Sequence, residues 1–184
     1  MSDPNDLAAF LDLGWQCLTR GVADRRAAAR HPSFATVSPE GRPEARTVVL
    51  RGASRSAGTV EVHTDGGSDK MASLRANPFA QLMIWDEKAK LQIRLSTSVE
   101  IAQGAEVADK WQKVPDGSRM AYGASPTPGT PIPQAHAYDK LAHRDWFTVL
   151  TCRIESVELM QLLDSHRRAV FRAEDGWLGQ WVVP

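Results

Sequence analysis

The sequence predicts an α+β fold, a small antiparallel barrel of about six strands with flanking helices. Two observations lead to this prediction. Residues 4–20 repeat apolar side chains at helical spacing, whereas the chain after His31-Pro32 shows the alternation of strands. The later segments are separated by short turns rich in glycine, proline and aspartate, as is typical of a small barrel.

The helical part comes first. Ser2 or Asp3 is expected to cap the first helix, with Pro4 at its first position. A second helical stretch, "VADRRAAAR", should stop before His31-Pro32, because the residue before a proline avoids the helical conformation.

The strands follow, with one short helix and one long loop among them. Ser68 is expected to cap that helix and Asn77-Pro78 to end it. "GAEVADKWQKV" also reads as helical, and residues 114–134 read as an irregular loop, either disordered or serving as a lid or interface. The expected strand segments are "SFATVS", "RPEARTVVLRG", "GTVEVHTD", the hairpin "FAQLMIW" with "KAKLQIRLSTSVEIA", and then "WFTVLTCRIESVELMQL", "HRRAVFRA" and "GWLGQWVVP".

Length and charge limit the function. A chain of 184 residues can build one core, so we expect a single domain, helical over about 4–30 and a barrel over about 32–184. Lys plus Arg and Asp plus Glu both number 22, which argues against nucleic acid or a membrane surface as partner. The start has no signal-peptide pattern, and Cys17 and Cys152 lack metal-ligand spacing. We therefore expect a cytoplasmic protein without a metal site.

One stretch, "EARTVVLRG", raises a question about charge. Strand alternation places Arg46 on the same face as Val48 and Leu50. An arginine on an apolar face is costly to desolvate unless an anion meets it. The anion is either a carboxylate of the chain, such as Glu44 or Glu61, or a bound ligand.

Four segments in register resemble the pyridoxamine 5'-phosphate oxidase-like flavoproteins. They are "GRPEARTVVLRG", "VEVHTDGGSDKMASLRANP", "AQLMIWDEKAKLQIRLSTSVEI" and "HRRAVFRAEDGWLGQWVVP". The resemblance implies a split β-barrel homodimer that binds FMN at the subunit interface. Arg46 and Lys70 would bind the FMN phosphate, Gln92 the polar edge of the ring, and Arg168 would come from the partner chain. The positions assigned to FMN are Arg46, Thr47, Val48, Val49, Leu50, Arg51, His63, Thr64, Ser68, Lys70, Gln92 and Arg168.

The substrate positions depart from the family pattern. The oxidases hold the substrate phosphate with Lys, Tyr, Arg and Ser, and a late Arg-x-His motif adds to the site. The corresponding positions here are Arg51, Lys110 or Trp111, Val114, Ser118 and the run Asp164-Ser165-His166. Arg51, Ser118 and His166 remain as candidate substrate contacts, and no catalytic residue is assigned. The resemblance thus implies an FMN-dependent oxidoreductase with altered substrate specificity.

Other functions and roles remain open. The same fold could serve as a non-catalytic flavin-binding or flavin-sensing module, or could hold haem or a deazaflavin instead of FMN. Lys70 could be a solvated charge, Gln92 a surface residue, and Arg168 a member of a surface ion pair.

Overall fold

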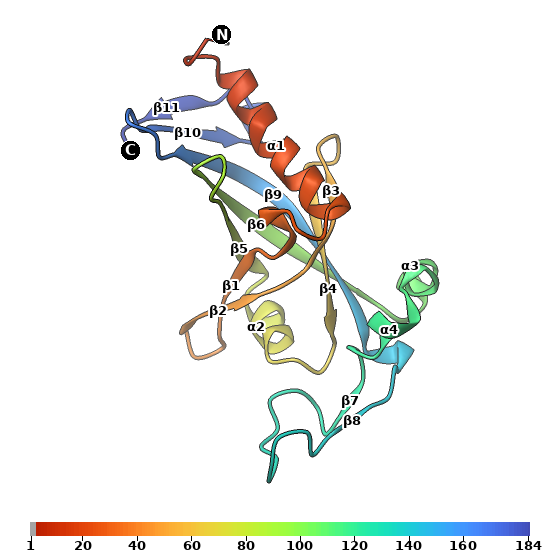
Figure 1. Ribbon diagram of the computed structural model, residues 1–184. Helices are drawn as coiled ribbons and strands as arrows, with labels where there is room; N and C mark the ends of the chain where they lie inside the picture. The colour runs from red at the N-terminus through yellow and green to blue at the C-terminus, as the bar shows by residue number, and fades with distance from the viewer. Residues whose placement is uncertain (1–2) are drawn as a thin grey trace.

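Nine strands form one antiparallel sheet in the structure, a computed structural model that describes residues 3–184 (Figure 1). The α+β class is confirmed, but the expected number of about six strands is wrong. One reason is that "RPEARTVVLRG" forms two strands, because pairing breaks off at Val48-Val49. The strands are β1 (Ser33–Val37), β2 (Pro43–Thr47), β3 (Leu50–Ser54), β4 (Thr59–Asp65), β5 (Phe79–Asp86), β6 (Leu91–Gln103), β9 (Phe147–Gln161), β10 (Arg167–Arg172) and β11 (Gln180–Val182).

The long strand β9 organises the sheet. It pairs with β6 along its whole length, and its other edge changes partner. Residues 147–153 pair with β4, and residues 156–161 pair with β10. The sheet order is β11-β10-β9-β6-β5-β1-β2, with β3 and β4 attached at the first half of β9. Segments at the two ends of β9 therefore lie far apart in one chain (Figure 1).

Helix α1 (Leu7–Ala23) covers one face of the sheet (Figure 1). Phe10, Trp15 and Leu18 are buried in the same core as sheet residues. The cap is Asp6, whose carboxylate accepts a hydrogen bond from the Ala9 amide at 2.9 Å, so the prediction of Asp3 as cap and Pro4 as first helical residue is wrong. The alternative cap, Ser2, lies outside the described residues. Among residues 3–184, no helix is long and apolar enough to cross a membrane.

The predicted second helix, over 22–30, is wrong as well. Helix α1 ends at Ala23, and only a 3-10 turn, η1 (Ala28–Arg30), follows. The Asp24 carboxylate accepts a hydrogen bond from the Arg26 amide at 2.9 Å. Such a local bond competes with helical pairing, because it favours a turn at the aspartate.

The remaining helices are short, and all of them except α2 belong to the segment 104–146. The expected helix over "GAEVADKWQKV" is confirmed, and the loop after it is irregular, as expected, with a two-stranded ladder within it. These elements are η2 (Gly104–Val107), α3 (Ala108–Lys113), α4 (Asp116–Arg119), β7 (Ala124–Ser125), β8 (Asp139–Lys140) and η3 (Arg144–Trp146), and α2 (Lys70–Ala76) follows β4.

Candidate functional site

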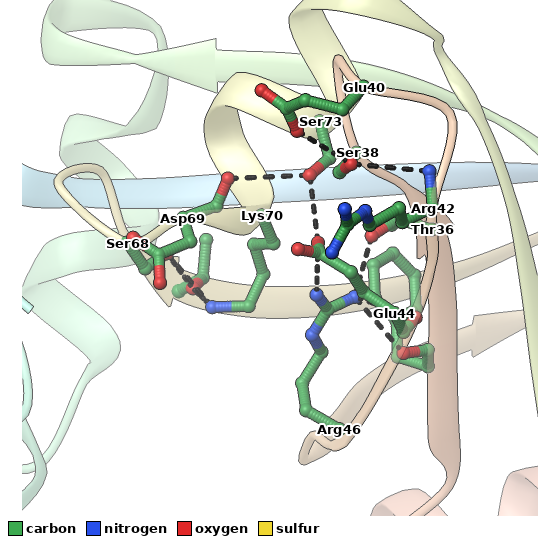
Figure 2. Close-up of polar contacts among 12 residues, drawn as sticks. Thr36, Ser38, Glu40, Arg42, Glu44, Arg46, Ser68, Asp69, Lys70 and Ser73 are labelled. Atoms are coloured by element: carbon green, nitrogen blue, oxygen red, sulfur yellow. Dashed lines mark hydrogen bonds and ion pairs between the residues drawn. The ribbon is translucent and has the colours of Figure 1, made fainter. Parts of the chain in front are cut away.

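Lys70 is the centre of the first polar cluster. Its ammonium donates hydrogen bonds to the Thr64 hydroxyl at 2.9 Å and to the Ser68 hydroxyl at 2.8 Å. Figure 2 shows the side chain reaching back from the start of α2 to Ser68. Among the residues that the structure describes, no carboxylate forms an ion pair with Lys70. The two hydroxyls and the ammonium, all predicted site residues, are thus brought together.

Arg46 completes this cluster but has a protein partner. Its guanidinium donates to the Glu44 carboxylate at 2.9 Å and to the Thr36 hydroxyl at 2.7 Å (Figure 2). Of the two carboxylates considered from the sequence, Glu44 is therefore the partner, and Glu61 is not. The Glu44 carboxylate also accepts a hydrogen bond from Ser73 on α2, so β2 and α2 are joined at the cluster.

The charge on Lys70 is not compensated. Burial lowers the pKa of Lys70, and the nearby positive charge of Arg46 lowers it further, against the opposite effect of Asp65 and Asp69. An anion beside Lys70 would favour the charged ammonium. Two cations with two hydroxyl groups are the donors that a phosphate prefers, so these residues fit the phosphate of FMN.

Ser68 does not cap α2 as predicted. Its hydroxyl donates to the Asp65 carbonyl at 2.7 Å and accepts from Lys70, and the N-cap residue Asp69 makes no side-chain capping bond. The Ser68 hydroxyl is therefore held towards Lys70 and away from the helix amides.

The predicted flavin-contacting stretch 46–51 is partly core. Val48 and Leu50 are buried, and Leu50 has no exposed surface, so neither side chain is free to contact a ligand in this structure. The side chain of Thr47 is exposed, and Val49 and Arg51 are half-buried. The alternation predicted for this stretch is observed in spite of the break between β2 and β3.

Gln92 and Arg168 form a second cluster on the other face of the sheet. Arg46 stands opposite the buried Phe34, on the core face, whereas Gln92 lies between the buried Leu91 and Ile93 and faces away from the core. Gln92 and Arg168 are both aligned with Met160 on β9. The Glu158 carboxylate accepts hydrogen bonds from Arg168 at 2.9 Å and from Arg94 at 3.1 Å. The surface ion pair considered for Arg168 is thus present.

The two clusters are distant within one chain. Thr64 stands opposite Thr148 near one end of β9, and Arg168 stands opposite Met160 near the other. The separation is about 40 Å along a strand that rises roughly 3.3 Å per residue. A single chain therefore does not bring Lys70 and Arg168 to one ligand.

A cavity of about 200 Å³ lies beside β3 and β4. His63 contacts the Glu61 carboxylate at 2.7 Å, and Lys110 on α3 binds the same carboxylate. Burial opposes ionisation of Glu61, but the hydrogen bonds from His63 and Lys110 outweigh it and lower the pKa of Glu61. The lining residues are Arg51, Glu61, His63, Lys110, Lys113, Val114 and Pro115.

Part of this cavity is predictable from the sequence. Arg51 and His63 were expected near the site, but Glu61 was considered only as a partner for Arg46. The signal for Glu61 was its position two residues before His63, which places both side chains on one face of β4. The proximity of Lys110 to Glu61 depends on how α3 folds back, which no local pattern indicates.

The other substrate candidates lie elsewhere. Ser118 is on α4, beyond the cavity residues Val114 and Pro115. His166 is exposed in the turn between β9 and β10, where its ring contacts the Leu163 carbonyl at 2.6 Å. Arg51, Ser118 and His166 are therefore not gathered into one site within a chain. Among residues 3–184, no group of three or more His, Cys, Asp or Glu side chains is arranged to hold a metal ion.

Asp65 joins the Lys70 cluster to the long loop. Its carboxylate accepts hydrogen bonds from the Gly67 amide at 2.7 Å and from the Gly123 amide at 2.6 Å. Gly123 follows Tyr122, whose ring packs with Trp111 and Phe147 next to the cavity. The turn that carries Ser68 and the wall of the cavity are thus tied to one buried carboxylate.

Comparisons with known proteins agree with the resemblance found in the sequence. Residues 14–103 match the family model described as "Pyridoxamine 5'-phosphate oxidase, FMN-binding domain". Curated pyridoxine/pyridoxamine 5'-phosphate oxidases are similar as well. One from Mycolicibacterium gilvum is 32% identical over 127 residues, which are 64% of this chain and 56% of that protein. One from Acinetobacter baumannii is 35% identical over 98 residues, 53% of this chain and 44% of that protein. The chain spans about half the length of these relatives.

Two solved structures share the fold. A pyridoxamine 5'-phosphate oxidase-related, FMN-binding protein from Nostoc punctiforme superposes with a TM-score of 0.78 at 22% identity, covering 97% of this chain and 99% of that one. PhzG from Burkholderia lata superposes with a TM-score of 0.72 at 18% identity, covering 99% of this chain and 95% of that one. Residues 14–103, just under half of the chain, thus match the FMN-binding domain of the pyridoxamine 5'-phosphate oxidase family, and the chain shares the fold of the two solved structures.

Proposed function

We propose that this protein binds FMN and uses it as an oxidoreductase with altered substrate specificity. The observation that carries the proposal is the Lys70 ammonium, which is half-buried, bound to two hydroxyls and without a carboxylate partner in residues 3–184. A phosphate at this position would compensate the charge of Lys70 and accept hydrogen bonds from Thr64 and Ser68. The positive charge of Arg46 lowers the pKa of Lys70, so it adds to the positive potential at this position.

We further propose that the complete site needs two chains. Gln92 and Arg168 lie on the outer face of the sheet, where Phe79, Met83 and Trp85 expose between 37% and 55% of their surface. Contiguous exposed apolar side chains favour a protein interface. A second chain placed on this face could present its Lys70 cluster to Gln92 and Arg168, which one chain cannot do.

The division of roles follows from chemistry. FMN, when bound, supplies the capacity to accept a hydride from an organic substrate. The residues of the chain would hold the phosphate through Lys70, exclude water with the long loop, and orient the substrate through the cavity at Arg51. The free thiols of Cys17 and Cys152 are compatible with the cytoplasmic location expected from the sequence.

Cofactor identity is the decisive test. The purified protein should show flavin absorption in the blue and near-ultraviolet, and FMN should bind far more tightly than riboflavin in a fluorescence titration. The phosphate contacts explain the difference, since each charge-assisted hydrogen bond contributes about 1.5–3 kcal/mol. Equal affinity for both flavins would contradict the phosphate site, and an intense Soret band would indicate haem. Flavin bound without turnover of any tested substrate would favour the non-catalytic module.

A further inference from the structure

Arg51 differs from the other arginines near the site because no carboxylate compensates it. Its guanidinium lines the 200 Å³ cavity, and its Nε atom is buried without a hydrogen-bond partner. Among residues 3–184, Arg51 forms no ion pair. Its neighbour is the Tyr122 hydroxyl. Burial raises the pKa of Tyr122, and the positive charge of Arg51 opposes this rise without cancelling it, so the hydroxyl is neutral. A half-buried guanidinium in this state favours an anion from outside the chain.

The walls of the cavity determine which anion fits. The lining has three cations, Arg51, Lys110 and Lys113, and one carboxylate, Glu61, so the formal charge of these four groups is three minus one, or plus two. Lys110 is already bound to Glu61, and Lys113 is exposed at the edge. The uncompensated charge inside the cavity is therefore close to that of one guanidinium.

We propose that this cavity, the Arg51 pocket, binds the carboxylate of a small organic acid, and that Glu61 disfavours a phosphate dianion there. The proposal rests on the proposed function, since the acid would be the substrate presented to the flavin. It adds the substrate class, a monocarboxylic acid, which is argued from the residues that line the cavity.

Geometry supports a carboxylate over a phosphate. A guanidinium offers two parallel N–H groups that match the two oxygens of a carboxylate. A phosphate dianion needs more donors, but the lining residue Val114 has an apolar side chain, and Glu61 would repel the second negative charge. Val114 is buried and can contact the carbon skeleton of the acid.

The test compares two probes of similar shape, benzoate and phenyl phosphate, by calorimetric titration of the 184-residue protein with and without FMN. Wild-type protein should bind benzoate more tightly than phenyl phosphate. Arg51→Gln should weaken benzoate binding by about 10- to 100-fold, as expected for loss of a charge-assisted bidentate contact. Arg51→Lys keeps the charge but loses the two parallel N–H donors, so its affinity for benzoate should lie between those of the wild type and Arg51→Gln.

Glu61→Gln provides the sharper test, because it should reverse the selectivity towards phenyl phosphate. The matched control is Arg55→Gln, whose arginine pairs with Asp12 and lies outside the pocket. Thermal unfolding checks that each variant is folded. Unchanged benzoate affinity in folded Arg51→Gln and Arg51→Lys proteins, or a wild-type preference for phenyl phosphate, would overturn the proposal.

The FMN titration tests the proposed function, and the benzoate titration tests the Arg51 pocket. Arg51-dependent benzoate binding in a protein that does not bind FMN would support the pocket and contradict the proposed function. FMN binding in a protein that binds no benzoate would contradict the pocket alone.

Discussion

Arg46, Arg51 and Lys70 are close in sequence, but each has a different kind of partner. Arg46 is compensated by Glu44, Lys70 is bound only to hydroxyls, and Arg51 has no ion pair within residues 3–184. Strand alternation predicted that Arg46 would face the core side. The same alternation places Glu44 beside Arg46, and their ion pair is one of the two alternatives that the sequence offers. Alternation could not predict that Lys70 and Arg51 would lack a carboxylate partner within the described part of the chain, because that depends on side-chain placement across elements.

Replacing Lys70 should change the stability of the FMN-free protein and its affinity for FMN in opposite directions. Lys70→Met removes a partly buried cation that the protein does not compensate, so the melting temperature of the FMN-free protein should rise. FMN affinity should fall by about 1.5–3 kcal/mol for the charged hydrogen bond lost, whereas riboflavin affinity should change little. Differential scanning fluorimetry and flavin fluorescence titration measure the two effects. A variant that is less stable without FMN would contradict this assignment.

The same residue implies a pH dependence. The pKa of Lys70 is lowered by folding from its ordinary value of 10.5, so in the pH range between the lowered and the ordinary value the unfolded chain binds more protons than the folded one. The stability of the FMN-free protein therefore contains a Lys70 contribution that rises with pH through that range. Lys70→Met should lack this contribution in chemical unfolding measured across alkaline pH.

At the scale of elements, segments with a strong local pattern were predicted and segments set by distant contacts were not. The hairpin of β5 and β6, strand β4 and the irregular loop after α3 follow from alternation and turn residues. The ends of α1 do not, because Asp6 and Asp24 use their carboxylates in local hydrogen bonds that several nearby residues could have made. The change of partner along β9 could not be predicted from the sequence either, because it arises when β4 and β10 both pair with the same edge of β9.

The attachment of the long loop can be tested through Asp65. In Asp65→Asn one oxygen can still accept from the Gly67 amide, but the side-chain amide would face the Gly123 N–H, donor against donor. A buried donor left without an acceptor costs about 1–3 kcal/mol. We expect faster amide hydrogen exchange across residues 114–146, with the β5–β6 hairpin unchanged, as measured by mass spectrometry.

Asp109→Asn is the matched control for Asp65→Asn. Asp109 is exposed on α3, and its carboxylate has no hydrogen bond or ion pair within residues 3–184. Its substitution should leave the exchange of the loop unchanged. Equal loop protection in wild-type and Asp65→Asn proteins would show that the loop is held by its other contacts, such as the Gly66 amide to the Trp146 carbonyl at 2.7 Å.

At the scale of the whole molecule, the distance between the two clusters within one chain is the basis of the proposed homodimer. Light scattering at micromolar concentration should give about twice the chain mass of 20.2 kDa. Trp85→Glu, on the exposed apolar face, should shift the protein towards monomer and weaken FMN binding together, because both depend on the second chain. A monomeric protein that keeps wild-type FMN affinity would contradict the two-chain site.

The last prediction is that pyridoxamine 5'-phosphate is a poor substrate. Its phosphate dianion needs several convergent donors. Arg51 is one, but Lys110 is bound to Glu61, and Val114 has no donor side chain. Arg119 does not replace the missing arginine in this structure, because its guanidinium is bound to the Asp116 carboxylate at 2.8 Å and to the carbonyls of Trp111 and Gln112.

Loss of two charge-assisted contacts corresponds to about 3–6 kcal/mol, or a factor of hundreds to tens of thousands in binding. Steady-state oxidation of pyridoxamine 5'-phosphate by the FMN-loaded protein, followed through the aldehyde product, should therefore fall far below that of an authentic oxidase assayed alongside. Glu61→Gln should raise this activity, since it removes the negative charge beside Arg51 and frees Lys110 for the phosphate. Wild-type activity comparable to the authentic oxidase would mean that the loop carrying Ser118 and Arg119 rearranges around the substrate and supplies donors that its present hydrogen bonds withhold.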